Sequence, residues 1–140
     1  KESAAMKLLI NICALLLFMV STAAAQMSAT VKFAPGNYGA MLSGTITGSE
    51  YFDYVLGAKA GQELFVELTV TATNGNGIAY FNILPPGSTG EAIYIGSMDD
   101  QNSATVQLPQ SGDYTIRVYL MGNDQDTGKT VSYNVDVSIQ

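Results

Sequence analysis

The last ten residues of the chain alternate strictly between apolar and polar side chains. In an extended strand, a period of two places one set on each face. The apolar set is Val131, Tyr133, Val135, Val137 and Ile139, and the polar set is Thr130, Ser132, Asn134, Asp136 and Ser138. The segment is therefore predicted to be an antiparallel strand with one face in a core and the other in water.

The same alternation recurs from residue 26 onward, where no segment keeps the 3.6-residue period of an amphipathic helix. Strands are expected at residues 30–34, 41–47, 51–58, 64–70, 78–84, 92–95, 104–108, 113–121 and 130–139. Turns rich in glycine, proline and asparagine separate them. This spacing leaves little room for crossover helices. It predicts an all-β fold, a single antiparallel β-sandwich or flattened barrel of about eight strands.

The first 25 residues are predicted to lie outside this fold. Met6 and Lys7 precede a short apolar run at residues 8–20, and three alanines at 23–25 supply a small-residue cleavage site. The run is shorter than the roughly 20 residues that span a bilayer. We therefore expect a cleaved signal peptide, no membrane anchor, and a periplasmic or secreted domain at residues 26–140. Residues 1–5 are interpreted as a misplaced start or a cloning remnant.

The composition excludes several classes of function. The 140 residues include no His and a single Cys, Cys13, which lies in the predicted signal peptide. Without His there can be no Ser-His-Asp or Cys-His catalysis and no imidazole ligand for a metal. The net charge is −6, or −7 once residues 1–25 are removed, which argues against nucleic acid as a partner. We expect no enzyme activity and no cofactor.

Two acidic loops are candidates for a metal or catalytic site. Asp99 and Asp100 form one, and Asp124, Asp126 and Gly128 in the other resemble half of a calcium loop. The second loop lacks the remaining ligands, and Asp and Gly are also ordinary turn residues. Neither carboxylate pair has neighbours that would desolvate one member for glycoside hydrolysis. Both loops are interpreted as turns, and no metal site is predicted.

Tyrosines and one arginine are candidates for a binding surface. Tyr51 and Tyr54 cluster at the start of one predicted strand, and Tyr119 lies opposite the apolar stripe of another. Tyrosine and arginine are common anchors of interfaces, but these tyrosines can equally be core or edge packing. Arg117, the only arginine in the chain, is either a strut paired with a carboxylate or a site residue.

Three stretches taken together resemble a known family. The first is SGTITG at residues 43–48, followed by Tyr51, Tyr54 and AKAGQ at 58–62. The second is YFNILPPGS at 80–88. The third is SGDYTIRVYLM at 111–121, followed by Asn123-Asp124 and by YNVDVSI at 133–139. In this order and spacing they are similar to the periplasmic inhibitors of goose-type (g-type) lysozyme. Some of the shorter elements also occur in pre-peptidase β-sandwich modules.

The resemblance implies an exported β-sandwich that docks a surface loop into the cleft of a lysozyme. The expected contact loops are a hairpin at residues 122–129 and a turn at residues 51–54. The residues predicted to contact the partner are Tyr51, Tyr54, Arg117, Tyr119, Asn123, Asp124 and Asp126. A monomer or weak dimer is expected. The alternative is a pre-peptidase-like module that binds glycan or calcium in the cell envelope.

The chain departs from the family pattern in that hairpin. The family carries several arginines around the positions that match Asn123-Asp124, whereas Gly122 and Asp126 stand here where arginines are expected. An arginine can pair with carboxylates of the cleft, and Asp126 would be repelled by them. The chain is thus identified as a member that has diverged in its arginine-bearing loop. Its negative charge would steer it toward a basic lysozyme.

Overall fold

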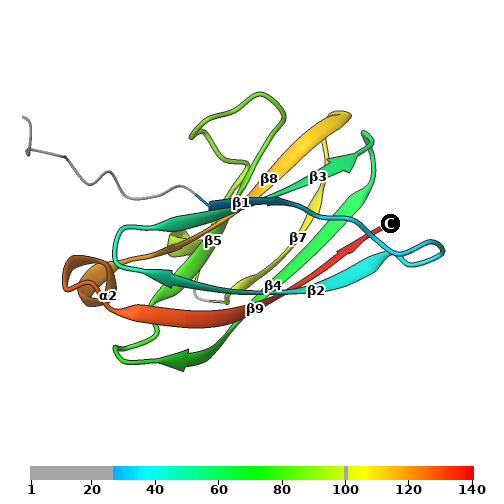
Figure 1. Ribbon diagram of the computed structural model, residues 1–140. Helices are drawn as coiled ribbons and strands as arrows, with labels where there is room; N and C mark the ends of the chain where they lie inside the picture. The colour runs from blue at the N-terminus through cyan, green and yellow to red at the C-terminus, as the bar shows by residue number, and fades with distance from the viewer. Residues whose placement is uncertain (1–26, 100) are drawn as a thin grey trace, which may run out of the picture.

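The computed structural model describes residues 27–99 and 101–140, so the predicted signal peptide and its cleavage site lie outside the described residues. Two sheets pack face to face, with the short helix α2 at one end (Figure 1). The strands are β1 Met27–Thr30, β2 Gly39–Thr47, β3 Tyr51–Ala58, β4 Glu63–Thr73, β5 Ala79–Leu84, β6 Tyr94–Ile95, β7 Ser103–Gln107, β8 Gly112–Leu120 and β9 Thr130–Ile139. The helices are η1 Gly96–Met98 and α2 Gly122–Asp126. The predicted all-β sandwich is confirmed.

The five-stranded sheet has the order β1-β3-β8-β5-β6, and the four-stranded sheet has the order β2-β9-β4-β7. Neighbouring strands are antiparallel except β1 and β3, which are parallel. The prediction of a wholly antiparallel sandwich was wrong at this edge. β2 lies between β1 and β3 in sequence but belongs to the other sheet, so the chain crosses the sandwich twice and returns in its original direction. The first strand also lies earlier than predicted, at residues 27–30 rather than 30–34.

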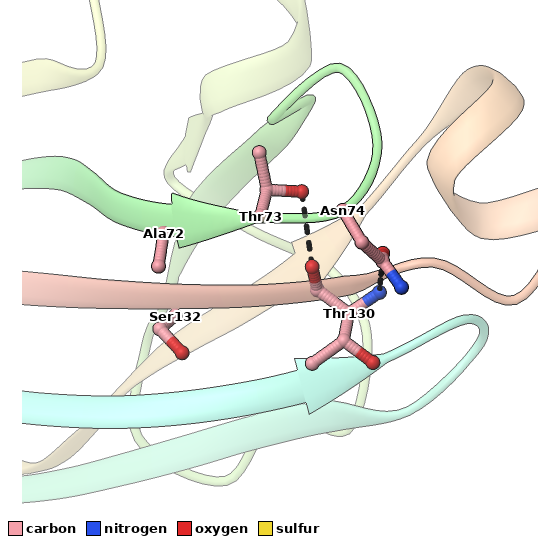
Figure 2. Close-up of a pocket in the computed structure, with 5 residues that line it drawn as sticks. All are labelled: Ala72, Thr73, Asn74, Thr130 and Ser132. Carbon is pink, nitrogen blue, oxygen red and sulfur yellow. Dashed lines mark hydrogen bonds between the residues drawn. The ribbon is translucent and has the colours of Figure 1, made fainter.

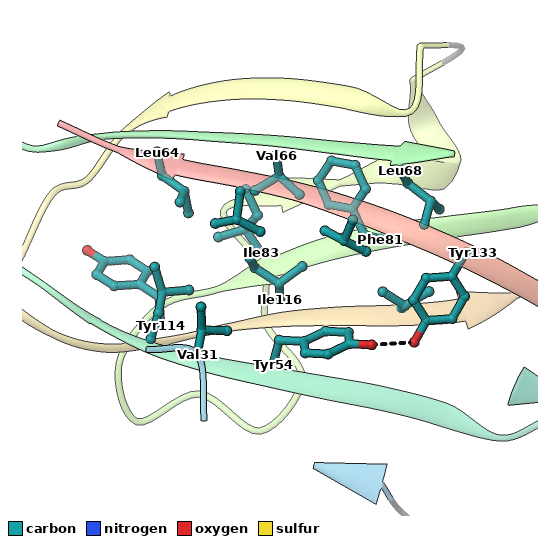
Figure 3. Packing of buried hydrophobic residues seen from close by; sticks show 14 of the residues in the cluster. Val31, Tyr54, Leu64, Val66, Leu68, Phe81, Ile83, Tyr114, Ile116 and Tyr133 are labelled. Carbon is teal, nitrogen blue, oxygen red and sulfur yellow. Dashed lines mark hydrogen bonds between the residues drawn. The ribbon is translucent and has the colours of Figure 1, made fainter. Parts of the chain in front are cut away.

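The core lies between the two sheets and consists of the inward residues of each alternating strand (Figure 3). The alternation predicted for the last strand is confirmed, because the five apolar residues of β9 are all buried. Opposite them, β8 and β5 contribute Ile116, Val118, Phe81 and Ile83, each with 0% exposure. Burying one such side chain stabilises the fold by about 1.5–3 kcal/mol. The core therefore holds the sandwich together without a disulfide in the described residues.

A pair of tyrosines bridges the two sheets inside this core. The hydroxyl oxygens of Tyr54 on β3 and Tyr133 on β9 lie 2.8 Å apart and share a hydrogen bond (Figure 3). Burial raises the pKa of both phenols, so the pair stays neutral. Gly44 on β2 makes room for it, since a Cβ there would lie 2.7 Å from the Tyr54 hydroxyl. Any larger residue at position 44 would displace the bridge.

The outer face of the four-stranded sheet is polar. Side chains of β2 and β9 form three cross-strand hydrogen bonds between Ser43 and Asn134, Thr45 and Ser132, and Thr47 and Thr130. We call these six residues the hydroxyl ladder. A β-bulge between Val70 and Ala72 lies beside the ladder, where β4 pairs with β9. An open pocket of about 260 Å³ lies there, lined by Ala72, Thr73, Asn74, Thr130 and Ser132 (Figure 2).

The segment after β8 is not the predicted hairpin. β8 pairs with β3 on one side and β5 on the other, so β9 has no place beside it and joins the four-stranded sheet. Residues 121–129 therefore cross from one sheet to the other through α2. Gly122 opens the crossing with φ of +60°. That left-handed conformation favours glycine over any residue with a Cβ, including the arginine that the family pattern leads one to expect.

Candidate partner-binding surface

Three connecting segments meet at one end of the sandwich. They are the β2–β3 turn, the β4–β5 loop and the segment that contains α2 (Figure 1). The Gly48 N–H of the first donates to the Lys129 carbonyl oxygen of the third at 2.9 Å. The Met121 N–H donates to the Ile78 carbonyl oxygen of the second at 3.1 Å. We call this region the α2 end.

Asp124 anchors the α2 end from within. Its side chain is fully buried, with 0% exposure. One carboxylate oxygen accepts the Asn76 N–H and the other accepts the Ile78 N–H, each at 2.8 Å. These backbone hydrogen bonds, that of Asn76 foremost, and the charge of Lys129 hold the pKa of Asp124 below its usual range. The carboxylate thereby ties α2 to the β4–β5 loop.

Asp124 was predicted as a partner contact, and its burial contradicts that prediction. A residue with no exposed surface cannot touch a docked protein unless the loop unfolds. Both carboxylate oxygens already accept backbone N–H groups, so the carboxylate is committed to the protein's own backbone. The sequence pattern predicts a solvated turn residue at Asp124, whereas the structure buries its carboxylate between two loops.

The opposite side of α2 is open to solvent. Asn123, Gln125, Asp126 and Thr127 are all exposed. The Thr127 hydroxyl donates to the Asn123 carbonyl oxygen at 2.6 Å and closes the helical turn. The predicted contacts Asn123 and Asp126 therefore lie on an exposed surface that is fixed by a buried anchor. Such a loop binds with little loss of conformational entropy.

A row of three tyrosines adjoins α2 on the outer face of the five-stranded sheet. Tyr51 on β3 and Tyr80 on β5 are both cross-strand neighbours of Tyr119 on β8. The rings of Tyr80 and Tyr119 have centroids 6.2 Å apart. The Tyr119 hydroxyl donates to the Asn82 side-chain oxygen at 2.7 Å. All three tyrosines are half-buried, so each keeps surface free for a partner.

Arg117 lies one step further from α2 on the same face and is a strut. Its Nε and Nη2 donate to the two carboxylate oxygens of Asp53 at 2.8 and 3.0 Å. Asp53 is buried, and Arg117 is about one-fifth exposed. The guanidinium carbon stacks 4.4 Å from the Tyr51 ring centroid, and Nη1 donates to the Thr89 carbonyl oxygen at 3.3 Å. The hydrogen bonds to Asp53 raise the pKa of Arg117, so it stays charged at any physiological pH.

Tyr54 is the second predicted contact that the structure contradicts. Alternation along β3 turns Tyr51 outward and Tyr54 inward, where it is 3% exposed and bonded to Tyr133. Residues 51–54 also form the start of a strand rather than a turn. The prediction groups the two tyrosines because they are close in sequence. In a strand, positions three apart lie on opposite faces.

The remaining predicted residues converge on one end of the molecule. Tyr51 and Tyr119 lie beside each other at the end of β3 and β8 that leads to Asn123 and Asp126. Sequence reasoning missed Tyr80, Asn82 and Thr89, which complete this face. The alternation in residues 78–84 turns Tyr80 and Asn82 away from Phe81 and was sufficient to find them. Nothing local to Thr89 signals its contact with Arg117.

Neither a metal centre nor a membrane span is found in the part of the chain that the structure describes. No group of three or more His, Cys, Asp or Glu side chains within residues 27–99 and 101–140 is arranged to hold a metal ion. Neither helix of these residues is long and apolar enough to cross a bilayer. Asp99, from the other acidic loop, accepts a hydrogen bond from the Tyr94 hydroxyl at 3.0 Å. Burial and this contact raise the pKa of Tyr94 to about 12.

Comparison with known proteins yields one curated relative and several solved structures. No family model matches the chain. An inhibitor of g-type lysozyme from Escherichia coli (strain K12) is 34% identical over 130 residues, which cover 90% of this chain and 92% of the relative. The periplasmic g-type lysozyme inhibitor of Aeromonas hydrophila superposes with a TM-score of 0.75 at 36% identity, covering 84% of this chain and all of that one.

A more distant structure shares only the fold. The pre-peptidase C-terminal domain of a collagenase from Bacillus anthracis superposes with a TM-score of 0.51 at 10% identity, covering 86% of this chain and all of that domain. That likeness confirms a common β-sandwich architecture and carries no functional statement. The Escherichia coli relative is similar to this chain in sequence along most of its length, and the Aeromonas hydrophila inhibitor is similar in both sequence and structure. The chain therefore belongs to the family of inhibitors of g-type lysozyme.

Proposed function

We propose that this chain is a periplasmic protein that inhibits a g-type lysozyme by binding it, without catalysing a reaction of its own. The observation that carries the proposal is its 34% identity, along nearly the full length, to an inhibitor of g-type lysozyme. The sequence agrees, because it contains no His for the common hydrolytic mechanisms.

The contact surface in this proposal is the exposed side of the α2 end together with the tyrosine row. It combines polar groups on a fixed helical turn, at Asn123, Gln125 and Asp126, with the aromatic surface of Tyr51 and Tyr119. Aromatic anchors beside a polar rim are typical of tight interfaces. Arg117 and Asp124 act as positioning residues. Their side chains hydrogen-bond to other parts of this chain and hold the contact surface in place, and they do not contact the enzyme.

The diverged loop sets the electrostatics of the proposed complex. With Gly122 and Asp126 in place of the arginines of the family pattern, α2 offers no cation to the carboxylates of a lysozyme cleft. Hydrogen bonds from Asn123 and Gln125 and packing by the tyrosines must then supply the affinity. The net charge of −6 for the full chain supplies attraction to a basic enzyme over a longer range. The association rate of the inhibitor with the enzyme should therefore fall as the salt concentration rises.

The direct test is inhibition by the purified domain of residues 26–140. Lysis of a peptidoglycan substrate by g-type, chicken-type and invertebrate-type lysozymes is measured at rising inhibitor concentration. We expect the g-type enzyme to be slowed at micromolar inhibitor and the other two classes to be slowed far less. If none of the three is slowed at that concentration, the proposal is wrong.

A charge change at Asp126 tests where the inhibitor docks. Asp126→Arg restores a cation of the family pattern at an exposed position of α2, and we expect it to tighten binding to the g-type enzyme about three- to tenfold. Asp113→Arg is the matched control, because Asp113 is exposed at the opposite end of β8 and the change in net charge is the same. An equal effect of both variants would show that net charge, and not the α2 end, governs binding.

A further inference from the structure

Strand β2 has a free edge that the proposed function does not use. Within residues 27–99 and 101–140, β2 pairs with β9 on one side and with no strand on the other. Its nine residues contain no charge and no proline, and its pairing with β9 has no bulge. Charges, prolines and bulges are the devices by which proteins protect an edge strand from pairing. β2 carries none of them.

The pattern of hydrogen bonds shows which backbone groups of β2 are open. The Ile139 N–H donates to the Tyr38 carbonyl oxygen, and the Gly48 N–H donates to the Lys129 carbonyl oxygen. In an antiparallel ladder such bonds recur at every second residue, so the even-numbered residues of β2 face β9. The odd-numbered residues turn their N–H and C=O groups away from the sheet. Met41, Ser43 and Thr45 in this set are exposed.

We propose that two copies of this chain dimerise by antiparallel pairing of their β2 strands about a twofold axis at Ser43. Ser43 then lies opposite the partner's Ser43, and Met41 lies opposite the partner's Thr45. Residues opposite one another in this register are both odd-numbered, so their open N–H and C=O groups meet. About six backbone hydrogen bonds form, and the two four-stranded sheets become one sheet of eight strands.

A second copy fits this edge better than an unrelated peptide. A twofold interface must be self-complementary. This pairing meets the condition, because the odd-numbered residues of one β2 pair with the odd-numbered residues of the other. A protein of net charge −6 repels its own copies, so self-association needs a neutral surface. β2 supplies one, because its nine residues and the adjoining hydroxyl ladder are uncharged. The carboxylate of Asp136 lies one strand further in, on β9 opposite Met41. The opposite edge of this sheet, β7, has only five residues.

The dimer would leave both α2 ends accessible. Thr47, at one end of β2, leads into the turn that contacts the α2 segment. Antiparallel pairing places the Thr47 ends of the two strands at opposite ends of the joint sheet. Each dimer would then carry two separate inhibitory surfaces and bind two lysozyme molecules. Dimerisation and inhibition are thus independent, and either can fail without the other.

Cysteine cross-linking tests the axis directly. Cys13 is the only native cysteine, so a Ser43→Cys variant of residues 26–140 carries a single thiol. Hydrogen-bonded neighbours across an antiparallel pair have Cα atoms about 5.5 Å apart, within disulfide range. We expect mild oxidation to give a disulfide-linked dimer about tenfold faster than for Thr69→Cys, an exposed control on β4 of the same sheet. Equal rates for the two variants would overturn the proposed axis.

Sedimentation of the disulfide-free protein supplies the second measurement. We expect the wild-type domain to form a dimer with a dissociation constant of about 10–100 μM. Ser43→Lys should weaken it at least tenfold, because two ammonium groups would face each other at the axis, while the matched Thr69→Lys should dimerise like the wild type. A wild-type domain that is wholly monomeric at several hundred micromolar would overturn the proposal. So would a Ser43→Lys variant that dimerises unchanged.

Discussion

The α2 end and the outer face of the four-stranded sheet are both polar, yet they are built differently. On the sheet face, the hydroxyl ladder satisfies its side chains among themselves, in or near solvent. At the α2 end, Asp124 is fully buried and binds the backbone of another loop. A polar surface is held rigid for recognition where a buried side chain beneath it is hydrogen-bonded to a neighbouring segment. We therefore expect substitutions of the buried residues at the α2 end to reduce stability and inhibition. Substitutions in the hydroxyl ladder should change both properties little.

Replacing Asp124 should have the largest effect. Asp124→Ala leaves the N–H groups of Asn76 and Ile78 without their carboxylate acceptor and releases α2 from the β4–β5 loop. We expect a clear drop in melting temperature and an inhibition constant raised more than tenfold. Asp126→Ala, two residues away and exposed, should change neither stability nor the fold. Equal effects of the two substitutions would contradict the anchoring role.

The ionisation of Asp124 also predicts how the stability of the fold depends on pH. Because the folded protein holds the pKa of Asp124 below its usual range, the ionised form contributes stability above about pH 4. This contribution is lost as the pH falls through the folded-state pKa. Thermal unfolding between pH 7 and pH 2 should therefore show a steeper acid loss for the wild type than for Asp124→Asn. Parallel curves for the two proteins would show that Asp124 is not the group responsible.

Arg117→Ala should have the next largest effect, on stability. It removes both hydrogen bonds that Arg117 donates to the Asp53 carboxylate and the cation stacked on Tyr51. We expect a loss of about 2 kcal/mol, because the substitution removes two charge-assisted hydrogen bonds to Asp53 together with the stacking on Tyr51. Chemical denaturation measures it. Asn134→Ala, in the hydroxyl ladder, is the comparison and should cost less than about 0.5 kcal/mol.

Tyr119→Ala should weaken inhibition more than it weakens the fold. The side chain is half-buried at the centre of the tyrosine row, and truncating an interface tyrosine commonly costs about 1–2 kcal/mol, or roughly tenfold in affinity. Tyr119→Phe keeps the ring and removes the hydrogen bond to Asn82, so it should retain most of the inhibition. If Tyr119→Ala inhibits as well as the wild type, the tyrosine row lies outside the interface.

The smallest effect is expected in the hydroxyl ladder itself. Thr45→Val removes a hydroxyl that shares an exposed hydrogen bond with Ser132, and valine favours strands as threonine does. Stability should change by less than about 0.5 kcal/mol, and inhibition should not change. A tenfold loss of inhibition would place the partner on this face. The hydroxyl ladder, and not the α2 end, would then be the recognition surface.

The sequence predicted the strands well and the burial of the candidate contact residues only in part. Alternation along the last strand identified both faces of β9 because the core accepts only one set of side chains. The same rule, applied to β3, would have turned Tyr54 inward. The burial of Asp124 could not be predicted, since its partners lie 46 and 48 residues away in the chain. The sequence does not decide whether Arg117 is a strut or a site residue, because its carboxylate partner, Asp53, is 64 residues away.

Hydrogen exchange in the complex tests the central claim, that a partner docks on the α2 end and the tyrosine row, most directly. Amide exchange of the domain at residues 26–140 is compared with and without a saturating g-type lysozyme. We predict added protection in α2 and at the Tyr51 end of β3, with no change along the hydroxyl ladder. Protection confined to β2, β9 and β4 of the four-stranded sheet, with α2 exchanging as in the free protein, would contradict it.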